Sequence, residues 1–105
     1  IAKGETNQQI QTRVCAARYL QIERQGKINA DLSSQELREV CPLNKEQKSL
    51  MNQAIDQFAL STRGFYRVLK VARTLADLEK ISYPEIPHYQ EALSYRSTMD
   101  RRASD

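Results

Sequence analysis

The chain has 105 residues, 40% of them hydrophobic, and a formal net charge of +3. This size suits one domain with a single core, and an excess of 16 basic over 13 acidic residues is too small to indicate nucleic-acid binding by itself. No hydrophobic run is long enough for a signal peptide or a membrane span, and the chain starts at Ile1, so we expect a fragment of a longer cytoplasmic protein without a membrane partner.

The first predicted helix covers residues 7–25, a stretch that lacks glycine and proline. Thr6 and Gln9, at its start, have the spacing of a capping box. Its narrow apolar stripe consists of Ile10, Val14 and Ala17. A loop over residues 25–32 follows, because Gly26 and Asn29 break the helical period. Two apolar residues of this loop are expected to reach the core, Ile28 and Leu32.

A short helix and a longer one are predicted next. Ser33 and Glu36 form a second capping-box pattern, and Pro42 ends the short helix that they begin. The apolar face of this short helix consists of Leu37, Val40 and Cys41. Asn44 with Gln47 then opens a helix that continues to about residue 59. Its apolar stripe consists of Leu50, Met51, Ala54, Ile55 and Phe58.

The clearest apolar pattern predicts a core-packed helix over residues 61–79, capped by Ser61 or Thr62. Its stripe consists of Phe65, Val68, Leu69, Ala72, Leu75 and Ala76. Polar residues recur on the opposite side, namely Arg67, Lys70, Thr74 and Asp77. Arg63 lies in the first turn, where the helix dipole favours anions. Its position is therefore either incidental, as for a solvated or ion-paired surface arginine, or set by a bound ligand.

The C-terminal part is predicted to hold one more helix. Pro84 and Pro87 indicate an extended segment, after which a helix from about His88 to Thr98 packs its apolar residues inward. Those residues are Tyr89, Ala92 and Leu93. No alternating strand pattern competes, so the expected fold is all-α, a compact bundle of four main helices plus one short helix. We expect the domain to cover residues 1–100 and residues 101–105 to form a disordered tail.

Several kinds of autonomous site are excluded by the residues themselves. With three glycines in all, neither a GxxxxGK[ST] phosphate loop nor a GxGxxG turn can be written. Cys15, Cys41 and the single histidine, His88, do not provide a zinc ligand set at finger spacings. Both thiols are expected to be reduced and partly buried. The chain alone is therefore expected to bind no metal and no cofactor.

Four segments together resemble one known family. They are GETNQQIQTRVCAARYLQIERQGKINADL at 4–32, CPL at 41–43, STRGFYRVLKVARTLADLE at 61–79 and HYQEALSYR at 88–96. In these segments the chain resembles the C-terminal domain of the magnesium-chelatase-like AAA+ ATPases, the bacterial ComM and YifB group. The resemblance implies the helical lid of an AAA+ motor, which closes over ATP while the Walker motifs and the arginine finger lie upstream. The chain would then be no enzyme by itself.

The resemblance also implies cofactors, partners and a site. ATP and Mg²⁺ would act in the full-length protein, with the upstream AAA+ core, neighbouring subunits of a hexameric ring and DNA as partners, the last in branch migration during transformation. Arg63, in the element Ser61-Thr62-Arg63, matches the family's sensor 2 arginine. A guanidinium suits that role because it stays charged and offers several fixed donors to phosphate oxygens.

Other basic residues receive weaker expectations. Arg67 and Arg73 lie further along the same helix, so they could reach only the edge of a phosphate site. They are expected to be secondary phosphate contacts, inter-subunit contacts or structural residues, and Arg73 can pair with Asp77 at i+4. Arg13 and Arg18 resemble family arginines that face either the ATPase core or water. His88 matches a family histidine for which capping or packing is the simplest role.

The chain departs from the family pattern in two places. The family reads SxRAYHR where this chain has Gly64, Phe65 and Tyr66, and glycine weakens a first turn by up to about 1 kcal/mol relative to alanine. Pro84 and Pro87 put the start of the last helix in doubt. Neither departure removes Arg63.

A function of a different class stays open on the residues alone. The sequence pI of about 9.0 and the pair Arg101 and Arg102 also fit a stand-alone basic helical module that binds DNA or a protein partner. A DNA titration of the isolated chain separates the two hypotheses, because phosphate-driven binding depends steeply on salt.

Overall fold

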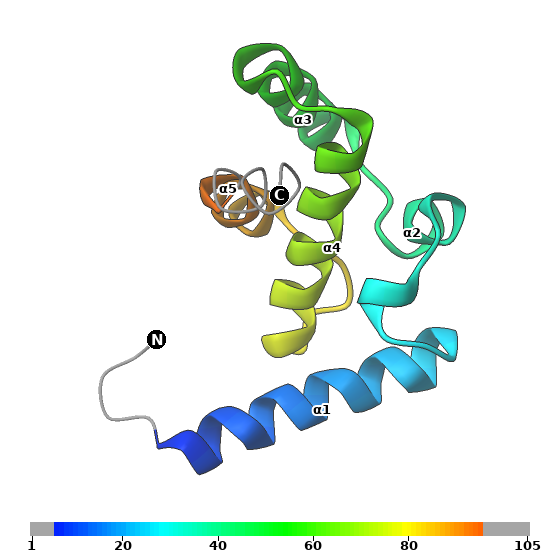
Figure 1. Ribbon diagram of the computed structural model, residues 1–105, viewed down its shortest axis with the longest axis vertical. Helices are drawn as coiled ribbons and strands as arrows, with labels where there is room; N and C mark the ends of the chain where they lie inside the picture. Colours follow the sequence, from blue (N-terminus) through cyan, green and yellow to red (C-terminus); the bar gives the residue numbers. More distant parts are fainter. Residues whose placement is uncertain (1–5, 96–105) are drawn as a thin grey trace.

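The computed structural model describes residues 6–95, and over them the chain is helical without a strand (Figure 1). The elements in chain order are α1 (Asn7–Gln25), the 3-10 turn η1 (Asn29–Asp31), α2 (Ser34–Val40), α3 (Lys45–Phe58), α4 (Thr62–Leu78) and α5 (Ile86–Ser94). This confirms the predicted bundle of four main helices and one short helix, and adds η1 within the predicted loop. The predicted tail and the domain boundary at residue 100 lie outside the described residues.

Side-chain caps begin the first four helices where the sequence predicts them. Reciprocal capping boxes join Thr6 to Gln9, Ser33 to Glu36 and Asn44 to Gln47. At α4, the Ser61 hydroxyl accepts a hydrogen bond of 3.0 Å from the backbone N–H of Gly64. Each cap satisfies backbone donors that have no partner inside the helix. Local sequence therefore determines where α4 begins, and so places Arg63 in its first turn.

The start of α5 differs from the prediction. The helix begins at Ile86, so Pro87 lies in its first turn and not in an extended segment. Proline is compatible with a first turn, because the backbone N–H that it lacks has no helical acceptor there. His88 caps this turn, since its Nδ1 accepts a 2.8 Å hydrogen bond from the Glu85 N–H, which confirms the expected capping role. The predicted end at Thr98 lies outside the described residues, and α5 ends at Ser94.

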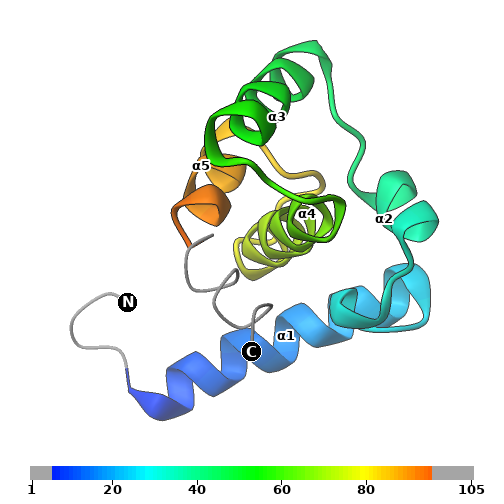
Figure 2. The ribbon, with the colours of Figure 1, turned by 45° about the horizontal axis from the view of Figure 1, so that its top comes forward.

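Helix α4 occupies the centre of the bundle (Figures 1 and 2). It contacts α5, α1, α2 and η1, whereas α3 packs mainly on α5. Both views show α1 crossing beneath the C-terminal end of α4, well away from the end that carries Arg63. None of the helices over residues 6–95 combines the length and the hydrophobicity of a membrane span.

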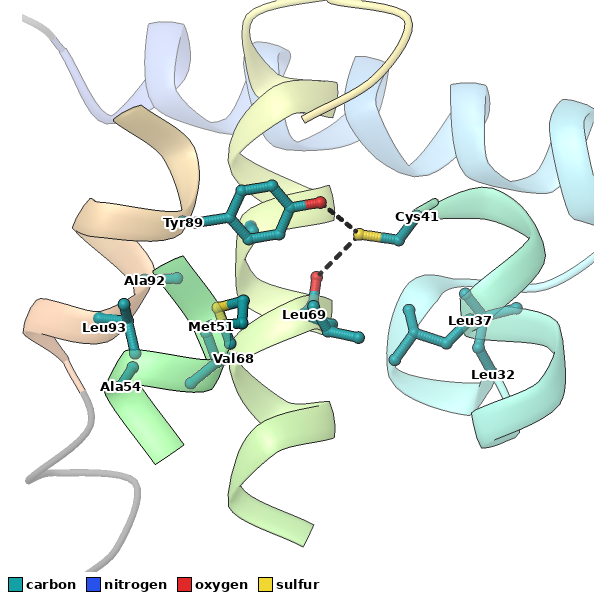
Figure 3. Close-up of a cluster of buried hydrophobic side chains, with 11 residues drawn as sticks. Leu32, Leu37, Cys41, Met51, Ala54, Val68, Leu69, Tyr89, Ala92 and Leu93 are labelled. Carbon is teal, nitrogen blue, oxygen red and sulfur yellow. Dashed lines mark hydrogen bonds between the residues drawn. The ribbon is translucent and has the colours of Figure 1, made fainter. Parts of the chain in front are cut away.

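The core gathers around α4 and α5 (Figure 3). Its largest buried apolar side chains are Leu37, Cys41, Met51, Val68, Leu69 and Tyr89. The Cys41 Sγ and the Tyr89 Oη lie 3.1 Å apart, and burial raises the pKa of both groups, so both stay neutral. Both cysteines are free, but Cys15 is exposed, so the expectation that it is partly buried was wrong.

Candidate functional site

Arg63 is the second residue of α4 and its side chain is exposed. Within residues 6–95 the guanidinium makes no hydrogen bond and no ion pair. A cation at a helix N-terminus is disfavoured by the helix dipole, and here no neighbouring carboxylate in the described chain compensates it. The arginine is therefore available to an anion from outside the chain.

A pocket of about 340 Å³ adjoins Arg63, between α2 and α4. Its lining residues are Leu32, Ser34, Leu37, Arg63, Tyr66, Arg67 and Lys70. The three cations of this set come from α4 at helical spacings of four and three, so they share one face. No carboxylate from residues 6–95 lines the pocket. We call this feature the cationic pocket, and its chemistry suits a multiply charged oxyanion.

Two contacts hold the walls of the cationic pocket. The Tyr66 hydroxyl accepts a 2.7 Å hydrogen bond from Arg38 Nη1, which ties α2 to the second turn of α4. Lys70 Nζ donates a 3.1 Å hydrogen bond to the Ala30 carbonyl, so its ammonium group already has one acceptor within the protein. Arg67 is half-buried and also has a partner within the protein. The structure thus brings Arg63 and Arg67 together, with Arg63 the more exposed.

Arg73 lies elsewhere, at the other end of α4, and only 1% of its side chain is exposed. Its Nη2 pairs with Asp77 Oδ1 at 2.9 Å, which confirms the predicted i+4 ion pair. The same guanidinium donates to three backbone carbonyls, those of Val40, Ile81 and Ser82. It therefore joins α2, α4 and the segment after α4. Of the three roles expected for Arg73, these contacts support the structural one.

Asp77 is the centre of a buried polar cluster, with 2% of its side chain exposed. It accepts from Arg24 at both carboxylate oxygens, at 2.8 and 3.2 Å, and from Asn29 Nδ2 at 2.9 Å. We call Arg24, Asn29, Arg73 and Asp77 the Asp77 cluster. The helical period placed Asp77 on the polar side of α4, and that expectation was wrong. Sequence reasoning missed Arg24 and Asn29, which are distant in sequence from Asp77 and carry no pattern that pairs them with it.

The Asp77 cluster makes stability depend on pH. Burial acts to raise the pKa of Asp77, but hydrogen bonds from Arg24 and Asn29 and the Arg73 charge outweigh it and leave that pKa below its ordinary value of 3.8. The unfolded chain therefore binds the proton more readily, so this stabilisation is fully present above pH 3.8 and is lost as the pH falls through the lower folded pKa.

We expect the difference in thermal midpoint between the wild type and Asp77→Asn to shrink as the pH is lowered below about 4. Asparagine keeps the size of the side chain but carries no titrating charge, so the comparison isolates this carboxyl from the other acidic groups. Thermal unfolding followed by circular dichroism between about pH 6 and pH 3 measures it. A difference that stays constant over this range would contradict the assignment.

The remaining sequence candidates lie apart from the cationic pocket. Arg13 and Arg18 are on the exposed surface of α1. His88 Nε2 lies 3.2 Å from Glu79 Oε1, so both ring nitrogens have structural partners. Within the described part of the chain, no group of three or more His, Cys, Asp or Glu side chains could hold a metal ion.

Known proteins are similar to this chain over most of its length. Residues 4–96 match the family described as magnesium chelatase, subunit ChlI C-terminal. The chain is 42% identical over 95 residues to the competence protein ComM of Haemophilus influenzae, which covers 90% of this chain and 19% of that protein. It is 40% identical over 97 residues to the protein YifB of Escherichia coli, covering 92% and 19%. The chain therefore spans about one fifth of the length of these relatives.

Proposed function

We propose that this chain, which belongs to the family described as the C-terminal region of magnesium chelatase subunit ChlI, is the helical lid of an AAA+ ATPase and contributes Arg63 as its sensor 2 residue. The observation that carries the proposal is the exposed guanidinium of Arg63, which has no partner within residues 6–95 and stands beside the cationic pocket. The all-helical bundle is consistent with a lid.

The roles of this chain's own residues follow from their positions. Arg63 would donate hydrogen bonds to the terminal phosphate of ATP, whose charge a guanidinium matches with several fixed donors. Arg67 and Lys70 lie one and two turns further along α4 and would add positive potential at the edge of the same site. ATP supplies the phosphoryl group for hydrolysis. ATP and Mg²⁺ would be held mainly by the rest of a longer polypeptide.

The proposal extends to partners of the whole protein. The lid would act with the upstream core of the same polypeptide and with neighbouring subunits of a cytoplasmic ring, and the motor would act on DNA. Similarity to a protein named for competence supports the DNA part. Because the chain spans about one fifth of that relative, the activity itself belongs to the longer protein.

We expect Arg63→Ala in the full-length protein to lower the rate of ATP hydrolysis at saturating ATP by about 100- to 1,000-fold, because a charge-assisted donor to the developing phosphate charge is lost. Arg63→Lys should retain part of the activity, since lysine keeps the charge but not the fork of donors. Steady-state phosphate release, measured with and without added DNA, checks both variants. Hydrolysis by Arg63→Ala at the wild-type rate would rule out the sensor role.

Lys48→Ala is the matched control, because Lys48 is an exposed cation on α3, away from the cationic pocket. Its hydrolysis rate should equal that of the wild type. Thermal unfolding of the isolated chain should be unchanged or slightly improved by Arg63→Ala, because removing a cation from a helix N-terminus relieves an unfavourable dipole interaction of about 0.3–1 kcal/mol. A lower hydrolysis rate of Arg63→Ala without a lower thermal midpoint would thus show that Arg63 acts in hydrolysis and not in folding.

A further inference from the structure

A second exposed guanidinium stands beside the cationic pocket, and it belongs to Arg38 of α2. Helix α2 lies beside α4 in both views of the fold (Figures 1 and 2). Arg38 follows Ser34 by four residues, so the two side chains share one side of α2, and Ser34 is among the residues that line the pocket. The charge of Arg38 is therefore close to the pocket, although Arg38 itself is not one of its lining residues.

The position of the Arg38 guanidinium is fixed by Tyr66, which does line the cationic pocket. Arg38 Nη1 donates a 2.7 Å hydrogen bond to the Tyr66 hydroxyl. The Tyr66 ring is half-buried and packs edge-to-face on Phe65, with the ring centroids 5.2 Å apart. Phe65 in turn packs against the hydrophobic core. The guanidinium is thus held through two aromatic rings, in a geometry that exists before any ligand binds.

Most hydrogen-bond donors of Arg38 are unused within residues 6–95. A guanidinium carries about five N–H donors. The Tyr66 hydroxyl is the acceptor that Arg38 contacts in this part of the chain, where Arg38 forms no ion pair with a carboxylate. A cation that is held in place but keeps open donors is suited to bind an anion from outside the chain, because little order has to be gained on binding.

The arrangement of charges around the cationic pocket favours a polyanion. Arg63 and Arg38 keep open donors and belong to two different helices. Arg67 and Lys70, in contrast, already have partners within the protein. A chain of phosphate groups carries charged oxygens along its length, so it can meet two guanidinium groups at once. The triphosphate of the proposed function has this chemistry.

We propose that Arg38 is a second phosphate-binding residue, which contacts triphosphate oxygens other than those that Arg63 contacts, and that Tyr66 is its positioning residue. The proposal rests on the proposed function, because it takes the cationic pocket to be the place where the triphosphate binds. Arg38 would donate the N–H groups that Tyr66 leaves open. Since it would contact phosphate groups that are not transferred, it would hold the triphosphate equally well before and during hydrolysis.

Binding of inorganic tripolyphosphate to the isolated chain tests the site directly. Two-dimensional NMR spectra at constant ionic strength should show saturable shifts of the backbone amides of Arg38, Arg63 and Tyr66. Arg38→Ala should weaken this binding by about tenfold, the loss expected for one charge-assisted hydrogen bond.

Arg18→Ala is the matched control for the net charge. Arg18 is an exposed arginine of α1 outside the cationic pocket, and its removal changes the net charge of the chain as much as the removal of Arg38 does. Because salt screens distant charges, the affinity of Arg18→Ala for tripolyphosphate should stay within about twofold of the wild type.

Two conservative variants separate contact with phosphate from a structural role of Arg38. Arg38→Lys should recover part of the lost affinity, because lysine keeps the charge but not the planar fork of donors. Tyr66→Phe removes the same hydrogen bond as Arg38→Ala but keeps the guanidinium, so it should weaken binding by only about two- to threefold. Equal losses of affinity for Arg38→Ala and Tyr66→Phe would show a structural role and overturn the proposal.

Kinetics of the full-length protein give an independent readout. Arg38→Ala should raise the KM for ATP by about tenfold and lower kcat far less than Arg63→Ala does, because the lost contact stabilises the bound triphosphate and the transition state alike. Steady-state phosphate release over a range of ATP concentrations measures both constants. An unchanged KM for Arg38→Ala would overturn the proposal.

Two results with the isolated chain would also overturn it. One is a wild-type chain without saturable shifts, and the other is an affinity of Arg38→Ala for tripolyphosphate equal to that of Arg18→Ala. Arg38-dependent binding of tripolyphosphate, combined with a full-length protein that hydrolyses no ATP, would support the anion site and contradict the proposed function. The failure of this proposal and that of the proposed function are therefore distinguishable.

Discussion

Replacing Asp77 with alanine is expected to lower the free energy of unfolding by about 3–5 kcal/mol, because it leaves the buried guanidinium of Arg73 without its anionic partner. Arg24 loses its bidentate acceptor at the same time, and Asn29 loses one of its contacts. A domain of this size has a total stability of about 5–15 kcal/mol. The loss is therefore a large part of the total, and urea denaturation of the isolated chain measures it.

Two further variants separate the charge effect from general disruption. Asp56→Ala should change the free energy of unfolding by less than about 0.5 kcal/mol, because Asp56 is exposed on α3. The double variant Arg73→Met, Asp77→Leu should lose less stability than Asp77→Ala, since it leaves no fully buried charge without a partner, and Arg24, which still loses its acceptor, is 27% exposed and can be solvated. Equal losses for Asp77→Ala and Asp56→Ala would show that the Asp77 cluster does not hold α1 and α2 to α4.

Tyr89→Ala should have a comparable effect on stability. The ring is fully buried, and its hydroxyl meets the Cys41 thiol across the core (Figure 3). Truncating a buried aromatic side chain to alanine removes its apolar burial and leaves a cavity, at a cost of about 3–5 kcal/mol. Chemical denaturation of the variant, with the slope of the transition compared with the wild type, measures this cost.

Tyr89→Phe separates the ring from its hydroxyl. It keeps the packing and removes only the contact with the Cys41 thiol, so we expect a loss of about 0.5–1.5 kcal/mol. Tyr95→Ala is the control, because Tyr95 is 47% exposed at the end of α5. If Tyr89→Phe cost as much as Tyr89→Ala, the hydroxyl contact and not core filling would dominate at this position.

The candidate site could be located in the sequence but not completed there. Arg63 follows a serine that can cap a helix, and this short-range pattern placed it correctly in the first turn of α4. The pocket beside it depends on where α2 lies, because Ser34 and Leu37 form its other wall. No local sequence pattern specifies how α2 packs against α4, so the residues around Arg63 could be identified only from the three-dimensional structure.

Helix positions in this protein are determined by the sequence itself. Capping side chains and backbone N–H groups three residues apart meet without help from the rest of the fold, and apolar residues at helical spacing select the buried side of α3 and α4. Even Pro87 obeys a local rule, since a first turn tolerates proline.

Only the tertiary structure decided which polar residues are buried and which are exposed. Asp77 and Arg73 belong to α4, yet whether they face water or the interior depends on α1 and α2, which bring Arg24, Asn29 and the Val40 carbonyl to them. The groove of about 860 Å³ between α1, the end of α2 and the segment after α4 arises in the same way, because two of the residues that line it, Tyr19 and Tyr83, are far apart in the chain. A buried charge is stable only where partners from several segments converge, and that convergence is a property of the packed bundle.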